Sequence, residues 1–181
     1  MMGPAADAVR STLAGFAAPF ELRIATPADR PALQRMLELY QHDLSDLWDQ
    51  DIDEHGEYGY ALDLYGQRPG CRAYVVCVAG RYAGFALVTP DVILPGGDHW
   101  MAQFFIMKKY RRRGIGEAVA TRLFDAWPGR WQVGQMPLNR PAVAFWRGTI
   151  GRYTGGRYTE TEVTQGWWLG TLQQFESPGR P

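Results

Sequence analysis

The sequence has few cysteines, no net charge and no long hydrophobic run, and each absence excludes a class of protein. Its two cysteines, Cys71 and Cys77, fall at the start and near the end of one apparent extended segment, where about 20 Å of chain would keep them from forming a disulfide. We therefore expect two buried thiols in a reduced, cytoplasmic protein. No segment approaches the roughly 20 apolar residues that span a bilayer, and the alanine-rich start makes a poor signal peptide.

The charges balance overall but are unevenly distributed. Nineteen basic residues match nineteen acidic ones, so the chain of 181 residues has no general electrostatic bias towards nucleic acid or membranes. Five of the six residues from 108 to 113 are basic, whereas residues 46–57 are strongly acidic. The length and an apolar share of 46% predict one globular domain with its own core.

Hydrophobic periodicity predicts a single α/β domain over residues 20–175, with a tail or extension at 1–19 and a tail at 176–181. A first amphipathic helix is expected after Asp29, which would be its N-cap. The expected strands are 21–25, 73–78, 82–89, 99–107 and 130–136, followed by a terminal strand or hairpin at 162–175. Further helices are expected at 115–127 and 139–146, with a possible helix at 60–64 and a glycine-rich loop at 151–156.

The most informative segment is the glycine turn, residues 111–116, which joins the expected strand 99–107 to the helix that follows. The first backbone N–H groups of a helix lack partners within the helix, and they lie at the positive end of its macrodipole. Gly114 and Gly116 have no side chain to keep an anion from these amides, and the neighbouring arginines add forked, charged donors. The turn therefore predicts a binding site for a phosphate-bearing ligand.

Other anion-binding motifs fit this turn poorly. A dinucleotide fingerprint needs Gly-x-Gly-x-x-Gly, but position 111 is arginine and position 119 is valine. An NTPase phosphate loop would need lysine at Glu117. The basic run alone could also be a nucleic-acid patch. That interpretation leaves unexplained why the run lies at one strand-to-helix junction in a neutral protein, and no nucleic-acid partner is expected.

At this point the chain resembles a known family, the GNAT acyl-CoA N-acyltransferases. Their signature, Gln/Arg-x-x-Gly-x-Gly/Ala, is matched by Arg111, Gly114 and Gly116 after a strand and Tyr110. The resemblance covers roughly residues 21–172, and residues 47–70 are the least similar part. It implies a single-domain GNAT fold, in which helices flank a mixed, mostly antiparallel central sheet.

A second motif strengthens the resemblance. Residues 139–146 contain Asn139-x-x-Ala142-x-x-Phe145-Trp146, which is similar to the family pattern Asn-x-x-Ala-x-x-Phe/Leu-Tyr. Asn139 would contact the pantetheine arm of the cofactor, but a simple N-cap explains it equally well. Phe145 and Trp146 would line the thiol end, or they would only pack in the core.

The resemblance implies acetyl-CoA as the co-substrate and no metal. Backbone groups of residues 105–107 would pair with the pantetheine arm, and amides of residues 112–117 would hold the pyrophosphate, with arginine side chains near the outer phosphates. The implied cofactor-binding residues are Phe105, Ile106, Met107, Arg111, Arg112, Arg113, Gly114, Ile115, Gly116, Glu117, Asn139, Ala142, Phe145 and Trp146.

Two positions depart from the family's catalytic pattern. The usual tyrosine acid corresponds to Trp146, whose indole N–H donates a hydrogen bond but is not a useful acid, and the base that some members carry corresponds to Gly134. An acid and a base would then come from elsewhere, or water would complete the proton transfer. Candidates for these roles are Tyr153, Tyr158 and His55, and Asp53 and Glu54 are candidates for substrate binding, although packing tyrosines and a solvated acidic loop explain them as well.

The resemblance implies an N-acetyltransferase that acts by direct transfer within a ternary complex, because neither cysteine lies near the thioester site. The acceptor is expected to be a small-molecule amine, favoured as cationic by the acidic loop, with a peptide or lysine as the alternative. A degenerate acyl-CoA-binding sensor or interaction module is the second hypothesis. Trp167 and Trp168 would lie either at the edge of a homodimer or in the core. No membrane partner is expected.

Overall fold

The computed structural model describes residues 19–179, so residues 1–18 and 180–181 of the two predicted tails lie outside the described residues. Within this range a seven-stranded sheet has the order β1-β2-β3-β4-β5-β7-β6, and all neighbouring strands are antiparallel except β4 and β5. The expected mixed, mostly antiparallel sheet flanked by helices is confirmed. The elements are β1 (Glu21–Ile24), η1 (Pro27–Asp29), α1 (Arg30–Trp48), β2 (Arg72–Val78), β3 (Arg81–Thr89), β4 (His99–Ile106), η2 (Lys108–Tyr110), α2 (Ile115–Ala126), β5 (Gly129–Gln135), α3 (Arg140–Thr154), β6 (Thr159–Val163) and β7 (Gly170–Ser177).

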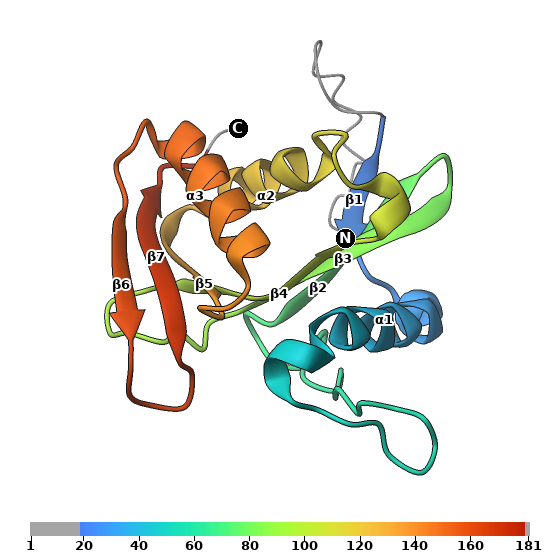
Figure 1. Ribbon diagram of the computed structural model, residues 1–181. Coiled ribbons are helices and arrows are strands. Elements are labelled where there is room, and N and C mark those ends of the chain that lie inside the picture. Colours follow the sequence, from blue (N-terminus) through green and yellow to red (C-terminus); the bar gives the residue numbers. More distant parts are fainter. Residues whose placement is uncertain (1–18, 180–181) are drawn as a thin grey trace.

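The helices cover both faces of the sheet, with α1 on one face and α2 and α3 on the other (Figure 1). Leu33 and Leu37 of α1 are spaced by one helical turn and pack in one buried cluster with β2 and β3. Val119 and Leu123 of α2 and Ile150 of α3 belong to a second cluster on the opposite face. No helix in this part of the chain combines the length and apolar character needed to cross a bilayer.

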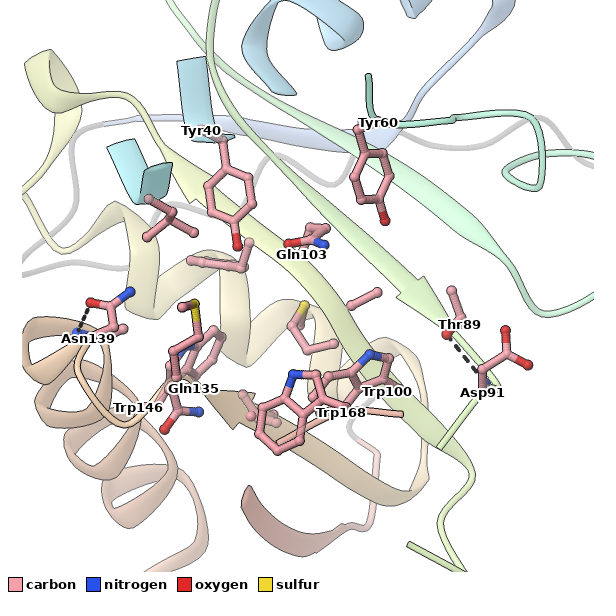
Figure 2. Close-up of a pocket in the computed structure, with 18 of the residues that line it drawn as sticks. Tyr40, Tyr60, Thr89, Asp91, Trp100, Gln103, Gln135, Asn139, Trp146 and Trp168 are labelled. Carbon is pink, nitrogen blue, oxygen red and sulfur yellow. Dashed lines mark hydrogen bonds between the residues drawn. The ribbon is translucent and has the colours of Figure 1, made fainter. Parts of the chain in front are cut away.

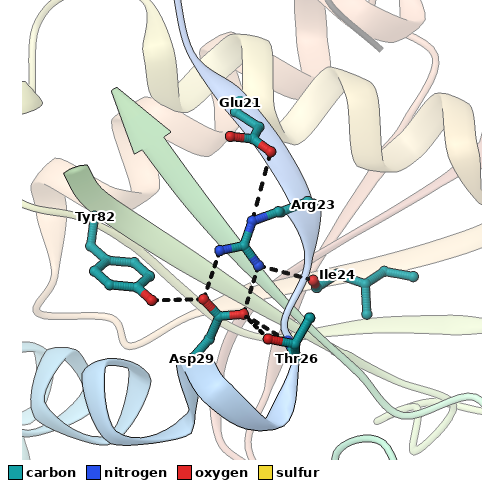
Figure 3. Close-up of polar contacts among 6 residues, drawn as sticks. All are labelled: Glu21, Arg23, Ile24, Thr26, Asp29 and Tyr82. Carbon is teal, nitrogen blue, oxygen red and sulfur yellow. Dashed lines mark hydrogen bonds and ion pairs between the residues drawn. The ribbon is translucent and has the colours of Figure 1, made fainter. Parts of the chain in front are cut away.

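Asp29 occupies the predicted N-cap position before α1, but its carboxylate turns back towards the sheet (Figure 3). Its oxygens accept two hydrogen bonds of 2.6 Å from Arg23, one of 2.7 Å from the Tyr82 hydroxyl, and two from the amide and hydroxyl of Thr26 at 2.8 and 2.6 Å. The hydrogen bonds from Arg23 hold the pKa of this carboxyl, which is 3% exposed, well below its usual value. This Asp29 network ties the start of α1 to β1 and β3.

The helix predicted at residues 139–146 is longer than expected. α3 continues to Thr154, and the predicted glycine loop begins only at Gly155, which ends the helix with a φ of 63°. Ile150 and Thr154 are buried, and the Thr154 hydroxyl donates to the carbonyl of Ile150 at 2.8 Å. Burial of this face therefore offsets the low helix propensity of Gly151. The sequence-based prediction ended the helix too early because it counted the glycines and not the burial.

The possible helix at residues 60–64 does not form. This segment contains turns, with the amide of Tyr65 donating to the carbonyl of Leu62 at 3.1 Å. Gly59 and Gly66 adopt φ values of 79° and 88° on either side, which are outside the helical region. At the C-terminal end, the hairpin rather than the single strand is correct, because β6 pairs with β7.

Candidate active site

The parallel junction between β4 and β5 is paired only at its start. His99 and Trp100 of β4 lie opposite Trp131 and Gln132 of β5, and no later residues of these strands pair with each other. The rest of β4 therefore has a free edge facing the gap between the two strands. The gap separates a half-sheet of β1 to β4 from a half-sheet of β5, β7 and β6.

The backbone N–H and C=O groups of successive residues in β4 point alternately towards β3 and towards the free edge. The amide of Met107 donates to the carbonyl of Ala83 at 2.9 Å, and Phe105 lies opposite Phe85, so both residues direct their backbone groups towards β3. Ile106, between them, faces the free edge, although its carbonyl accepts a 2.6 Å hydrogen bond from Nε of Arg111. Of the three residues expected to pair with pantetheine, Ile106 thus offers its amide to the gap.

The glycine turn places helix amides beside this edge. Arg112 and Gly114 adopt φ values of 59° and 73°, and Gly114 is the N-cap of α2. The first amides of α2, those of residues 115–117, have no acceptor within the helix. A methyl group on Gly116 would lie 3.3 Å from Cζ of Phe145, so α2 and α3 meet closely here. The carboxylate of Glu117 is held by Arg152 at 2.6 and 2.7 Å, towards α3.

Four of the five basic side chains from residue 108 to 113 divide into two groups. Lys108 and Arg111 pair with the two oxygens of Asp43 on α1 at 3.0 and 2.8 Å. Partial burial acts to raise the pKa of the Asp43 carboxyl, but hydrogen bonds and charges from Arg111 and Lys108 outweigh it and lower that pKa. Arg112 and Arg113 are exposed and form no ion pair with any residue between 19 and 179. Their charge is available to a ligand.

A cavity of about 370 Å³ lies where β4 and β5 separate, and we call it the β4–β5 cavity (Figure 2). Segments from α1 to the β6–β7 loop contribute to it, and most of its side chains are aromatic or apolar. Its lining residues are Tyr40, Leu44, Trp48, Tyr60, Leu64, Tyr65, Thr89, Asp91, Trp100, Met101, Ala102, Gln103, Phe104, Val133, Gly134, Gln135, Met136, Asn139, Ala142, Trp146, Trp167 and Trp168.

One wall of the cavity carries polar groups. The hydroxyls of Tyr40 and Tyr60 and the amide of Gln103 point into it (Figure 2). The Tyr60 hydroxyl lies 3.3 Å from that of Tyr65, whereas the side-chain polar atoms of Tyr40 and Gln103 form no hydrogen bond with another described residue. Burial raises the pKa of Tyr40, with a smaller contribution from Tyr60, so this phenol stays protonated.

The opposite wall is built from tryptophans. Trp100 and Trp168 pack edge to face with ring centroids 5.3 Å apart. A methyl group on Gly134 would lie 2.4 Å from Cζ2 of Trp168 and 2.5 Å from Cη2 of Trp100. The position at which some relatives would carry a base is therefore filled by two indole rings. Trp146 is buried against Phe104, with centroids 4.9 Å apart, and also lines the cavity.

The second motif contributes part of the cavity lining. The Asn139 side chain accepts a 3.2 Å hydrogen bond from the amide of Ala142, which confirms the N-cap interpretation. Asn139, Ala142 and Trp146 also line the cavity, so capping and ligand contact remain compatible for Asn139. Phe145 does not line the cavity; it packs with Phe104 at a centroid distance of 6.0 Å.

The catalytic candidates from the sequence lie outside the cavity lining. The Tyr153 hydroxyl donates to Asp125 at 2.8 Å and lies 2.7 Å from the Ser177 hydroxyl, on the α2 side of α3. Tyr158 follows α3 and is partly buried in the α2 and α3 cluster. The His55 side chain is 75% exposed, 3.5 Å from the Glu54 carboxylate.

Asp53 and Glu54, the substrate candidates, lie in the same exposed loop as His55. Both carboxylate side chains are exposed, and Oδ1 of Asp53 accepts hydrogen bonds from the amides of His55 and Glu57, each at 2.9 Å. This geometry organises the turn. The structure does not bring these residues into the β4–β5 cavity, and it contains no cluster of three metal-binding side chains within residues 19–179.

Sequence reasoning did not identify Tyr40, Tyr60 and the Trp100–Trp168 wall as parts of one site. Tyr40 has the spacing of a core residue of α1, and Tyr60 lies in a segment without periodicity. No local pattern marks them, since their association depends on how α1 and residues 60–65 pack across the free edge of β4.

Comparison with known proteins agrees with this architecture. The model of the acetyltransferase (GNAT) family matches residues 33–150, which is more than half of the chain. No curated protein matches the chain.

Solved structures show the same fold at low sequence identity. An acetyltransferase from Thermus thermophilus is 17% identical, with a TM-score of 0.64 over 90% of this chain and 99% of that chain. A putative acetyltransferase from Salmonella typhimurium with its cofactor acetyl-CoA is 18% identical, with a TM-score of 0.58 over 87% and 93% of the two chains. The ribosomal-protein-S5-alanine acetyltransferase from Vibrio fischeri is 13% identical, with a TM-score of 0.57 over 87% and 93%.

Proposed function

The chain belongs to the acetyltransferase (GNAT) family, and from this premise we propose that it transfers the acetyl group of acetyl-CoA to the nitrogen of an amine. The observation that carries the proposal is the continuity of three features: the glycine turn, the free edge of β4 and the β4–β5 cavity. A phosphate-rich ligand with an extended arm matches the first two. The Salmonella relative, named as a complex with acetyl-CoA, supports the choice of that ligand.

The cofactor would be held mainly by backbone groups. Amides of residues 112–117 would receive the pyrophosphate, because no side chain caps this helix start, and the exposed charges of Arg112 and Arg113 would add to this attraction. Arg111 would act indirectly, since its guanidinium already binds Ile106 and Asp43. The Ile106 amide on the free edge would bind the pantetheine arm or the thioester oxygen.

The transfer needs no covalent intermediate with the protein. The amine nitrogen attacks the thioester carbon, the C–S bond breaks, and coenzyme A departs as a thiolate that takes a proton from water. Cys71 and Cys77 are both buried, and burial raises the pKa of each thiol, so neither has the character of a nucleophile. Direct transfer in a ternary complex is therefore the mechanism we favour.

The cavity supplies hydrogen-bond donors rather than an acid and a base. The Tyr40 hydroxyl faces the cavity with unused bonding capacity, and it would donate a hydrogen bond to the departing sulfur or the oxyanion. Tyr153, Tyr158 and His55 would need a change of conformation to reach the same point, so the geometry favours Tyr40. Deprotonation of the attacking nitrogen would then be left to water.

The indole rings around Gly134 and the tryptophan at position 146 favour a second candidate function. At Gly134 and Trp146, two catalytic positions of the family hold groups that cannot exchange protons. A coenzyme A sensor or interaction module would have no need of groups that can. Such a protein would bind acetyl-CoA without releasing the thiol. A cavity of about 370 Å³ beside the thioester position argues for an acceptor, and we rank the enzyme first.

The test combines acetyl-CoA binding with thiol release in a panel of amines, peptides and polyamines. Amine-dependent thiol release establishes the transferase, whereas binding without release across the panel supports the sensor. The double variant Arg112→Ala/Arg113→Ala is expected to weaken acetyl-CoA binding about tenfold at low salt. Arg157→Ala, an exposed arginine beyond the far end of α3, is the matched control and should leave binding unchanged.

Other features of the function remain proposals. A small-molecule acceptor is favoured by the aromatic and apolar lining of the cavity, and a peptide terminus or lysine side chain is the alternative. Trp168 is half-buried in the cavity wall, which favours a packing role, whereas Trp167 is 68% exposed and remains a candidate for a dimer contact. A cytoplasmic location remains a prediction from the sequence.

A further inference from the structure

The titratable side chains of the β4–β5 cavity are few and of one kind. Within residues 19–179 the lining includes three tyrosines, Tyr40, Tyr60 and Tyr65, and one carboxylate, Asp91. No histidine, lysine, arginine, glutamate or cysteine of the described chain lines it. Apart from the faces of its aromatic rings, which attract cations more weakly, the ability of the cavity to hold a cation or accept its proton depends on these four groups.

The Asp91 carboxylate already has a charged partner. Its two carboxylate oxygens each accept a 2.6 Å hydrogen bond from Arg68 in a forked ion pair. Figure 2 places Asp91 at the margin of the cavity, with the carboxylate turned away from the space between the Tyr40 and Trp168 walls. An ammonium group in the cavity would find this charge compensated and directed elsewhere.

The tyrosines are donors and not bases. Burial raises the pKa of Tyr40 and Tyr65, so both phenols keep their protons far above neutral pH. A phenol bound to its proton offers only a weak acceptor lone pair. The cavity thus has no unpaired anion for an ammonium and no side chain to deprotonate it.

The shape of the cavity favours a flat, apolar body. Trp100 and Trp168 form one wall, Tyr60 faces them, and exposed Trp48 and Trp167 extend the aromatic surface to the rim. An aromatic ring gains both burial and ring contacts in such a setting. The Tyr40 hydroxyl and the Gln103 amide provide the polar contacts that would orient a neutral nitrogen.

We propose that the acceptor of this protein is an aromatic amine bound in its neutral form, an arylamine or similarly weak base, rather than a cationic alkylamine. This inference rests on the proposed acetyl transfer and departs from the cationic acceptor that the acidic segment at residues 46–57 favoured. That segment's candidates, Asp53 and Glu54, lie outside the cavity lining.

The chemistry balances without a side-chain base. The neutral nitrogen uses its lone pair to form the C–N bond with the acetyl carbon, and the C–S electrons leave with the coenzyme A thiolate. The nitrogen then loses one proton to water, and the thiolate gains one. An alkylamine with a pKa near 10.4 is neutral in only about one molecule in a thousand at pH 7, so it would enter this cavity at a heavy disadvantage.

The test uses two isomers of the same formula, 4-ethylaniline and 2-phenylethylamine, which differ chiefly in basicity. Binding to the full chain with coenzyme A present is followed by the fluorescence of the cavity tryptophans. At pH 7, 4-ethylaniline is expected to bind about 1,000-fold more tightly, and its Kd should be constant from pH 6 to 9. The Kd of 2-phenylethylamine should fall about tenfold per pH unit over the same range.

A variant tests the role of the Asp91 ion pair. Arg68→Met frees the Asp91 carboxylate at the cavity margin, which should tighten binding of 2-phenylethylamine about fivefold and leave that of 4-ethylaniline unchanged. Arg30→Met is the matched control, because it frees Asp63, which does not line the cavity. Equal effects of both variants would mean that long-range charge, and not the cavity, governs selection.

The outcomes separate this inference from the proposed function. If 2-phenylethylamine binds as tightly as its isomer at pH 7, or if neither binds, the neutral-acceptor inference is overturned. Thiol release from acetyl-CoA with any amine would still establish the transferase in that case. Absence of both acetyl-CoA binding and thiol release would overturn the proposed function itself.

Discussion

The Asp29 network and the polar wall of the β4–β5 cavity both contain polar side chains that are shielded from solvent. They differ in how many of their donors and acceptors have hydrogen-bond partners. Around Asp29, both carboxylate oxygens are occupied by donors from β1, the turn before α1 and β3. In the β4–β5 cavity, the hydroxyl of Tyr40 and the amide of Gln103 form no bond with described residues. Saturated polar groups fix the fold, whereas unsaturated ones at a cavity are available to a ligand.

The comparison predicts its largest effect at Asp29. Asp29→Asn keeps the shape but removes the charge that Arg23 pairs with, and we expect a loss of about 3 kcal/mol in the free energy of unfolding. Urea denaturation measures this loss. Asp63→Asn, which removes the partner of Arg30 from an exposed pair, should cost less than about 0.5 kcal/mol. Equal losses would mean that burial of Asp29 adds nothing.

Lowering the pH should also reveal the contribution of Asp29 to the free energy of unfolding. The pKa of Asp29 is lower in the folded protein than in the unfolded chain, so its contribution is complete above the unfolded value of about 3.9. It is lost as the pH falls below that value towards the folded pKa. Between pH 6 and pH 3, wild type should lose about 1 kcal/mol more stability than Asp29→Asn. Parallel curves for the two proteins would contradict this assignment.

The tryptophan wall of the cavity tests the other region. Gly134→Ala would force the rings of Trp100 and Trp168 apart, with an expected loss of about 1–3 kcal/mol in the free energy of unfolding. Acceptor binding should weaken more than acetyl-CoA binding, as titration of each ligand would show. Gly151→Ala is the control: its methyl group meets only Tyr158 at 3.9 Å, and a gain of about 0.5 kcal/mol is expected.

A pair of tyrosine variants gives the smallest but sharpest contrast. Tyr82→Phe removes a hydrogen bond to Asp29 and should lower the free energy of unfolding measurably, with thiol release unchanged. Tyr40→Phe removes a hydroxyl that bonds to no described residue, so stability should stay within about 0.5 kcal/mol while thiol release falls about tenfold. If both variants change the same property, the distinction between the two regions fails.

Local sequence patterns were sufficient for the parts of the fold that depend on near neighbours. The glycine turn, the hairpin of β2 and β3 and the Asn139 cap each lie within one short segment, and the structure has all three. The end of α3 was misjudged, because burial of Ile150 and Thr154 against the sheet decides it and glycine content does not.

Local sequence patterns could not predict the cavity, because its walls come from segments far apart in the sequence. Its polar wall joins Tyr40 from α1, Gln103 from β4 and Tyr60 from an irregular segment, and its other wall joins β4 to the β6–β7 loop. The sequence did show what the cavity lacks, since Trp146 and Gly134 stand where relatives carry titratable groups. It could not show that two indole rings fill the space next to Gly134.

The short pairing of β4 with β5 also affects which parts of the sheet unfold together in local opening. Between residues 19 and 179, β4 and β5 share only two paired positions, next to one backbone hydrogen bond from Asp98 to Arg130, whereas β2 with β3 and β5 with β7 are joined along their lengths. We therefore expect amide hydrogen exchange to divide the sheet into two cooperative units, β1 to β4 and β5 to β7. A ligand that spans the gap would couple them, so that slower exchange on both sides would report its binding.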